Sequence, residues 1–189
     1  GSFTRLLALL DKLLAGRAYL FGGRPSLADF GLAGQLVQLN SDPTPGALLR
    51  AQAPNVVRWL ERMESPKAEG EFEGLSTLRD ELVELLGAEV AGAYLVWMDA
   101  NGRAVADDAS GVSVEIAGTA FVQKPQRYAA KALAELKRKR AAVSDDALAR
   151  LLAATGVDAF LLGQALDAEH EEDGDPDDDD GASDNGDET

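Results

Sequence analysis

The chain contains few side chains that are suited to catalysis. Its single histidine is His170, near the end of the sequence, and it has no cysteine. A Ser-His-Asp triad, a thiol nucleophile and a cysteine metal site therefore cannot form in the body of the protein. Ser26 and Asp29 are a polar pair at a three-residue spacing, but Ser26 has no histidine to activate it. We predict no catalytic residue in this chain, and the identity of any cofactor-binding residues stays open.

The segment Ser26-Leu27-Ala28-Asp29 has the pattern of a helix-capping box. In such a box the serine hydroxyl accepts a hydrogen bond from the amide three residues later, and the acidic side chain reaches back to the serine amide. We therefore predict that Ser26 and Asp29 form a structural helix cap. Loss of the Asp29 carboxylate is expected to cost roughly 1 kcal/mol, and more if its partners are buried.

The cap opens a predicted helix over 26–40 that is apolar on nearly every side after Asp29. Helices of this kind are normally buried, so we predict that this one lies in the core. Gly31 and Gly34 each lower the stability of the helix by about 1 kcal/mol relative to alanine. We expect these glycines to permit close contact with a neighbouring helix.

Two motifs follow one another at a fixed distance. The first is Tyr19-Leu20-Phe21-Gly22 followed by Pro25-Ser26-Leu27-Ala28-Asp29-Phe30, and the second is Ala53-Pro54 with Trp59 five residues after the proline. Together they resemble the C-terminal helical domain of the glutathione S-transferase superfamily, in which the first motif opens the buried central helix. The resemblance covers residues 3–64.

This resemblance implies a function. Glutathione would be the co-substrate, a small electrophile would be conjugated or reduced, and a homodimer would be the assembly. In the family a thioredoxin-like domain binds glutathione and carries the catalytic Tyr, Ser or Cys, and no segment of this chain resembles that domain. We therefore expect the chain to be the C-terminal portion of a longer parent protein. It would serve there as scaffold and as part of the substrate-pocket wall, and be inactive alone.

An alternative comes from a different functional class. Helical domains of this family also serve as protein-interaction modules, for example in aminoacyl-tRNA synthetases and in elongation-factor gamma subunits. The resemblance is therefore also compatible with a non-enzymatic interaction module.

The predicted fold is mainly α-helical with one small β-hairpin. We expect part of the transferase-like helical domain over 1–64, a helical extension over 65–166 with the hairpin near 112–123, and a disordered acidic tail over 167–189. The hairpin is indicated by alternation of apolar and polar residues on both sides of Ala117-Gly118. A loop is expected over 41–46 and a turn over 99–102. The predicted helices span 3–19, 26–40, 47–52, 55–63, 75–86, 88–98, 127–142, 146–155 and 157–166.

The charge is unevenly distributed along the sequence. Residues 167–189 contain no lysine or arginine, and without them the chain is nearly neutral. This composition argues against a nucleic-acid-binding protein. No apolar run approaches the roughly 20 residues of a membrane span. We expect a cytoplasmic protein without a membrane partner.

Two charged clusters suggest weaker hypotheses. Acidic residues from Glu169 to Asp180 fall at the offsets of a calcium-binding EF-hand loop, but Pro176 interrupts it. We therefore predict weak cation binding there and no specific metal site. The basic residues of the helix over 127–142 are predicted to form a solvated face, although they could instead attract the acidic tail of the same or another chain: Lys131, Lys137, Arg138, Lys139 and Arg140.

The aromatic residues are predicted to lie in the core. Trp59 shares a helix face with Val56 and Leu60. The three tyrosines have apolar neighbours on helical faces, so we expect core packing for them as well, although they could instead line a pocket: Tyr19, Tyr94 and Tyr128.

Overall fold

The computed structural model describes residues 2–163 of the chain. This part is mainly helical, with one two-stranded antiparallel sheet, which confirms the predicted fold class. None of its helices is long and apolar enough to cross a membrane. The acidic tail over 167–189 lies outside the described residues, together with its expected disorder and cation binding.

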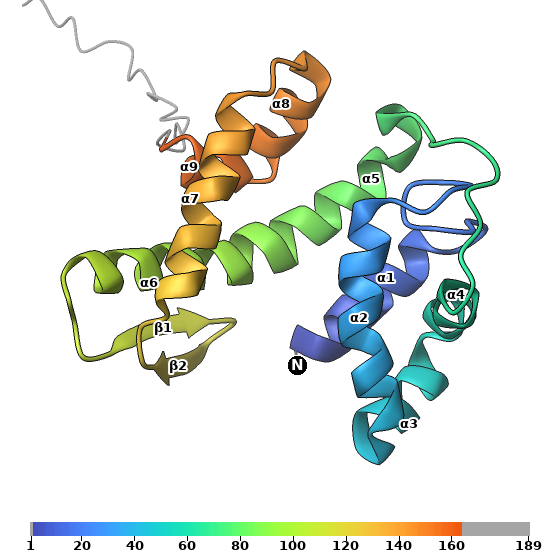
Figure 1. Cartoon of the computed structure of the whole chain (residues 1–189), viewed down its shortest axis with the longest axis horizontal. Coiled ribbons are helices and arrows are strands. Elements are labelled where there is room, and N and C mark those ends of the chain that lie inside the picture. Colours follow the sequence, from blue (N-terminus) through green and yellow to red (C-terminus); the bar gives the residue numbers. More distant parts are fainter. Residues whose placement is uncertain (1, 164–189) are drawn as a thin grey trace, which may run out of the picture.

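Four helices form the first lobe, drawn from blue to blue-green in Figure 1: α1 (Ser2–Leu13), α2 (Leu27–Ser41), α3 (Pro43–Gln52) and α4 (Pro54–Met63). Apolar faces of these helices meet in a core around Trp59, Leu7 and Leu49, each of which is fully buried. The predicted core position of Trp59 is confirmed. The N-terminus of α4 is capped from another helix, because the Asp11 carboxylate accepts a hydrogen bond of 2.6 Å from the Asn55 amide.

Two helix boundaries in this lobe were predicted wrongly. The first helix ends at Leu13 and not at residue 19, because the chain turns through Gly16, whose φ is +77°. The segment predicted as a loop over 41–46 is largely helical. Helix α3 begins at Pro43, where a proline is favoured, and the Asp42 carboxylate caps it by accepting from the Thr44 amide.

The segment between the first lobe and the next helix pairs with the loop before α2. The Gly23 amide donates to the Glu71 carbonyl over 2.8 Å, and the Glu73 amide donates to the Phe21 carbonyl over 2.9 Å. A Cβ atom on Gly22 would lie 2.7 Å from the Glu71 carbonyl oxygen. Only glycine permits this approach of the two backbones.

A continuous helical rod connects the two lobes. It consists of α5 (Leu75–Leu85), the π-helical segment η1 (Leu86–Leu95) and α6 (Val96–Ala106), shown in green and yellow-green (Figure 1). The separate helices predicted over 75–86 and 88–98 are therefore one element. The turn predicted over 99–102 is wrong, because Asn101 is fully buried inside α6 and its amide is used in a tertiary contact.

The predicted hairpin is present. Strands β1 (Val112–Ile116) and β2 (Thr119–Gln123) are antiparallel, with Val112 opposite Gln123 and Ile116 opposite Thr119. Ala117 and Gly118 both have positive φ, +50° and +75°. Positive φ at both central residues is what a two-residue type I′ turn requires.

Three helices complete the second lobe: α7 (Arg127–Ala141), α8 (Asp146–Ala154) and α9 (Val157–Leu161). The Asp145 carboxylate caps α8 by accepting from the Leu148 amide, and Gly156 ends it with a φ of +75°. The last helix is shorter than predicted and ends at Leu161. The second core joins η1, α6, α7 and α9, with Leu95, Met98 and Leu133 at its centre.

Residues on both sides of residue 64 share one hydrophobic core. The core of the first lobe also contains Leu78 and Leu82 of α5 and Leu151 of α8. The predicted division into a domain over 1–64 and an extension over 65–166 stays a prediction. In the described part, the extension completes the core of the first lobe.

Candidate functional site

The Asp29 carboxylate is the centre of a buried polar network in the first lobe. Its oxygens accept hydrogen bonds from the Leu20 amide (2.8 Å), the Ser26 amide (2.8 Å), the Ser26 hydroxyl (2.6 Å) and the Trp59 indole nitrogen (2.9 Å). Asp29 has no exposed surface. The capping box is therefore formed, and the same carboxylate also binds the loop after α1 and helix α4. The Ser26 hydroxyl donates to a carboxylate that is already shared, which fits a structural role.

Helix α2 presents an apolar stripe to solvent. Within residues 3–62, the exposed large hydrophobic side chains are Leu27 (87 %), Phe30 (52 %) and Val37 (49 %), all on α2. Their spacing places them on one side of the helix. The prediction that this helix lies in the core is thus wrong for this side of α2. Its buried face is limited to Asp29, Ala33 and Leu36.

The two glycines of α2 lie on this same side. A Cβ atom on Gly31 or Gly34 would meet no atom within 4 Å. The expectation that they permit close contact with a neighbouring helix is therefore wrong for the described residues. Instead they leave the middle of the stripe flat, between Phe30 and Val37.

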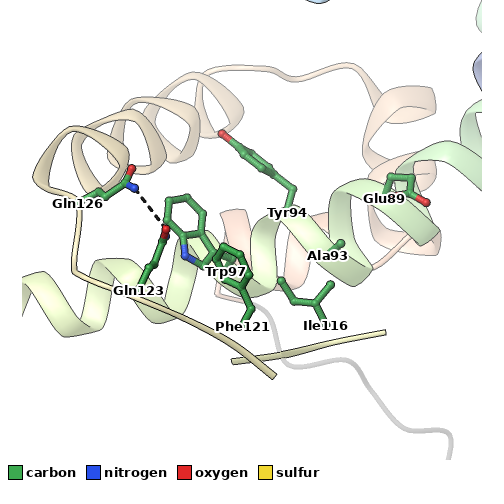
Figure 2. A pocket seen from close by; sticks show the side chains of 8 residues that line it. All are labelled: Glu89, Ala93, Tyr94, Trp97, Ile116, Phe121, Gln123 and Gln126. Atoms are coloured by element: carbon green, nitrogen blue, oxygen red, sulfur yellow. Dashed lines mark hydrogen bonds between the residues drawn. The ribbon is translucent and has the colours of Figure 1, made fainter. Parts of the chain in front are cut away.

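A cavity of about 410 Å³ lies in the second lobe, between the helical rod and the hairpin. Figure 2 shows the Trp97 indole with Tyr94 on one side of it and the hairpin residues on the other. Cavities of this size are typical of small-molecule sites. The lining residues are Glu89, Ala93, Tyr94, Trp97, Ile116, Phe121, Gln123 and Gln126.

One residue of the cavity lining carries an unsatisfied donor beneath the surface. In the described part of the chain, Trp97 Nε1 is the one buried side-chain nitrogen or oxygen without a hydrogen-bond partner. Buried polar groups are otherwise almost always paired. At the rim, the Gln126 side chain donates to the Gln123 side chain over 3.4 Å, drawn as the dashed line in Figure 2.

Comparison with known families bears on the first lobe only. Residues 1–62 match the family model described as the glutathione S-transferase C-terminal domain. The predicted resemblance is thereby confirmed for this lobe. No curated protein and no solved structure gives a significant match. The cavity beside Trp97 lies outside the residues matched to the glutathione S-transferase domain, whereas the Asp29 network and the apolar stripe of α2 lie within them.

The described residues contain no cluster of metal ligands. Across residues 2–163 there is no group of three or more His, Asp or Glu side chains arranged to hold a metal ion. His170 and the acidic residues of the EF-hand-like pattern lie beyond this range.

Two of the three tyrosines were predicted to lie in the core but are exposed. Tyr94 is 47 % exposed and lines the cavity, and Tyr128 is exposed as well, so the predicted core positions of both are wrong. Tyr19 is buried as predicted, and its hydroxyl accepts from the Lys67 amide over 2.9 Å. No local pattern marks Trp97, because it follows an apolar run that gives no sign of an unpaired indole.

The cavity rim is held in place by Asn101. Its side-chain amide donates to the Gln126 carbonyl over 3.0 Å and accepts from the Gln126 amide over 2.7 Å. Asn101→Ala should lower the free energy of unfolding by about 2 kcal/mol, because it removes both bonds and leaves a small void. Urea denaturation checks this value, with Gln35→Ala at an exposed position of α2 as the control. If the Asn101→Ala and Gln35→Ala variants were equally stable, the two hydrogen bonds between Asn101 and Gln126 would not contribute to stability as stated.

Proposed function

We propose that the chain is the C-terminal portion of a glutathione S-transferase-like protein. In the full-length parent it would take part in conjugating glutathione to small electrophiles, or in reducing them. The match of residues 1–62 to the glutathione S-transferase C-terminal domain is the observation that supports this most strongly. In that family glutathione is the co-substrate, and the part that binds it is a thioredoxin-like domain. No residue of this chain is assigned to catalysis.

The apolar stripe of α2 is the surface that we assign to the electrophile. Leu27, Phe30 and Val37 are exposed, and the glycines between them leave room for a flat apolar group. Burying such a group against this stripe is favourable, by roughly 25 cal/mol for each Å² of apolar surface removed from water. The stripe would thus form one wall of a pocket that the glutathione-binding domain completes.

The remaining parts of the proposal follow the family. The chain alone would be inactive, the parent would be a cytoplasmic homodimer, and neither a metal, a nucleic acid nor a membrane would take part. Ser26 and Asp29 would act in folding only. The first domain would span 1–64, with the extension over 65–166 packed against it.

The role of the apolar stripe of α2 in binding the electrophile can be tested by steady-state kinetics. The assay uses the full-length parent with 1-chloro-2,4-dinitrobenzene and glutathione. Phe30→Ser should raise KM for the aromatic electrophile about tenfold, since it removes an apolar contact worth over 1 kcal/mol. KM for glutathione should stay unchanged. Val122→Ser, at an exposed position of the hairpin, is the control. Conjugation by the isolated chain, or an unchanged KM for the electrophile, would contradict the proposal.

The alternative of a protein-interaction module rests on the same stripe. An exposed apolar surface of this kind is also typical of protein-binding sites. If the parent binds no glutathione and Phe30→Ser instead weakens an assembly of the parent with a protein partner, the interaction module is the better reading.

A further inference from the structure

We propose that a second cavity, between the end of α1 and helix α4, binds the dianionic phosphate group of a small phosphate monoester. This arginine cavity has a volume of about 300 Å³, at the lower end of the range of small-molecule sites. Three of its lining residues are arginines, and none is acidic: Arg17, Arg58 and Arg62. It shares no residue with the apolar stripe of α2, so this inference and the proposed function can fail independently.

Two of the three arginines carry a charge without a counter-charge. Arg17, whose side chain is 11 % exposed, forms ion pairs with Glu73 over 2.9 Å and with Glu81 over 3.8 Å. Within residues 2–163, no ion pair involves Arg58 or Arg62. The cavity therefore presents two uncompensated positive charges, which match the two negative charges of a phosphate monoester.

The two arginines are positioned on one face of α4, four residues apart. Arg62 Nη1 donates to the Ala18 carbonyl over 2.7 Å, and the Arg62 guanidinium lies 5.9 Å from the centre of the Tyr19 ring. Arg58 Nη2 donates to the Asn55 side chain. Each guanidinium has five N–H donors, so most of them remain for a ligand. Arginine binds phosphate with pairs of parallel hydrogen bonds.

The acidic side chains around the arginine cavity limit the size of the anion. The Asp11 carboxylate accepts hydrogen bonds from Asn55 and Val56 and does not line the cavity. Glu61 and Glu69 line an adjacent cavity, which shares Ala18 and Arg62 with this one. Like charges at these positions disfavour a polyanion that extends beyond the cavity. A single phosphate group is therefore favoured over a nucleic acid.

The rest of the ligand is small and hydrophilic. The cavity is larger than a phosphate ion, so an organic group has room beside the phosphate. A Cβ atom on Gly16 would meet no atom within 4 Å, which leaves space over the loop after α1. The lining offers the Asn55 amide and few apolar groups. A sugar phosphate meets these requirements better than an aromatic phosphate.

Titration calorimetry of the full chain at pH 8 and constant ionic strength tests the proposal, with glucose 6-phosphate as the probe. The chain has a net charge of −15, so it offers no general attraction for anions. We expect saturable binding of glucose 6-phosphate. Glucose 6-sulfate, which has the same tetrahedral group but one charge, should bind at least tenfold more weakly, and glucose should not bind. Absence of saturable binding, or equal affinity for the phosphate and the sulfate, would overturn the proposal.

Inorganic phosphate distinguishes the two sources of this dianion. It should bind more weakly than glucose 6-phosphate, because it leaves part of the cavity unfilled. Equal affinity for the two would identify the free ion as the ligand and overturn the assignment to a monoester.

A matched pair of arginine variants tests the location of the site. Arg58→Gln should weaken binding of glucose 6-phosphate about tenfold, because it removes one positive charge and its hydrogen bonds to the phosphate. Arg50→Gln, on α3, is the control for net charge. Arg50 is exposed and donates to the Asn40 side chain over 2.9 Å, much as Arg58 donates to Asn55. Equal affinities of the two variants would overturn the location.

Amide resonances of the ¹⁵N-labelled chain give a readout that does not depend on a substitution. The Gly16 resonance should shift in a saturable manner with glucose 6-phosphate, and the Gly118 resonance, in the hairpin turn, should stay in place. Unchanged Gly16, or equal shifts of both resonances, would overturn the proposal.

Discussion

Asp29→Ala is expected to lower the free energy of unfolding by about 4 kcal/mol. This exceeds the roughly 1 kcal/mol of a helix cap alone, because the carboxylate also satisfies donors that lie far away in the sequence. The substitution leaves the Leu20 amide and Trp59 Nε1 without an acceptor in the core. Each unsatisfied buried donor costs about 1 to 3 kcal/mol.

Urea denaturation followed by circular dichroism checks this value. Ser26→Ala should cost only about 1 kcal/mol, since it removes the hydroxyl and leaves the other donors of the Asp29 network paired. Asp146→Ala is the matched control, because Asp146 is also an acidic residue in the first turn of a helix but is exposed. A loss for Asp29→Ala no larger than that for Asp146→Ala would contradict the central role of the network.

Asp158→Ala is expected to cost about 3 kcal/mol. Asp158 and Arg140 form a two-fold hydrogen-bonded ion pair, with 2.8 Å from each of two guanidinium nitrogens to a carboxylate oxygen. The side chains are only 9 % and 5 % exposed. Removing one partner leaves the other charge buried and uncompensated, which is costlier than losing an exposed pair.

A double-mutant cycle separates the pair from the packing. Asp158→Leu combined with Arg140→Met should recover much of the loss, because an apolar pair of similar volume needs no counter-charge. The hydrogen bonds that Arg140 donates to the Asp158 carboxylate raise the pKa of Arg140, so the arginine's contribution to stability is lost only as the pH rises through that raised value. Stability of the native pair should therefore not fall between about pH 7 and about pH 10 through this group. In the double-mutant cycle, additive losses of unfolding free energy would contradict the coupling between Asp158 and Arg140.

Local signals in the sequence predicted the local structures well. The alternation over 112–116, with Ala117-Gly118 at its end, specified a hairpin because only a two-residue turn with positive φ fits that spacing. The capping box and the end of α8 at Gly156 were likewise readable, since each depends on residues close together in the chain. The transferase-like motifs of the first lobe belong to the same class of signal.

Features that depend on contacts between distant residues could not be predicted from local sequence patterns. Arg140 lies in a run of basic residues that predicts a solvated face, yet its side chain is largely covered because α9 brings Asp158 to it. Asn101-Gly102 is a turn signal that the buried contact with Gln126 overrides. The cavity lies between Trp97 of the rod and Phe121 of the hairpin. No local sequence pattern links residues that far apart in the chain.

The most direct test of the proposed function is titration calorimetry with glutathione, on this chain and on the full-length parent side by side. We expect saturable binding by the parent and no binding by the chain alone, since the family places the glutathione site in a thioredoxin-like domain. Saturable binding by the isolated chain would contradict this division of roles. Absence of binding by both would contradict the transferase assignment itself and favour the interaction module.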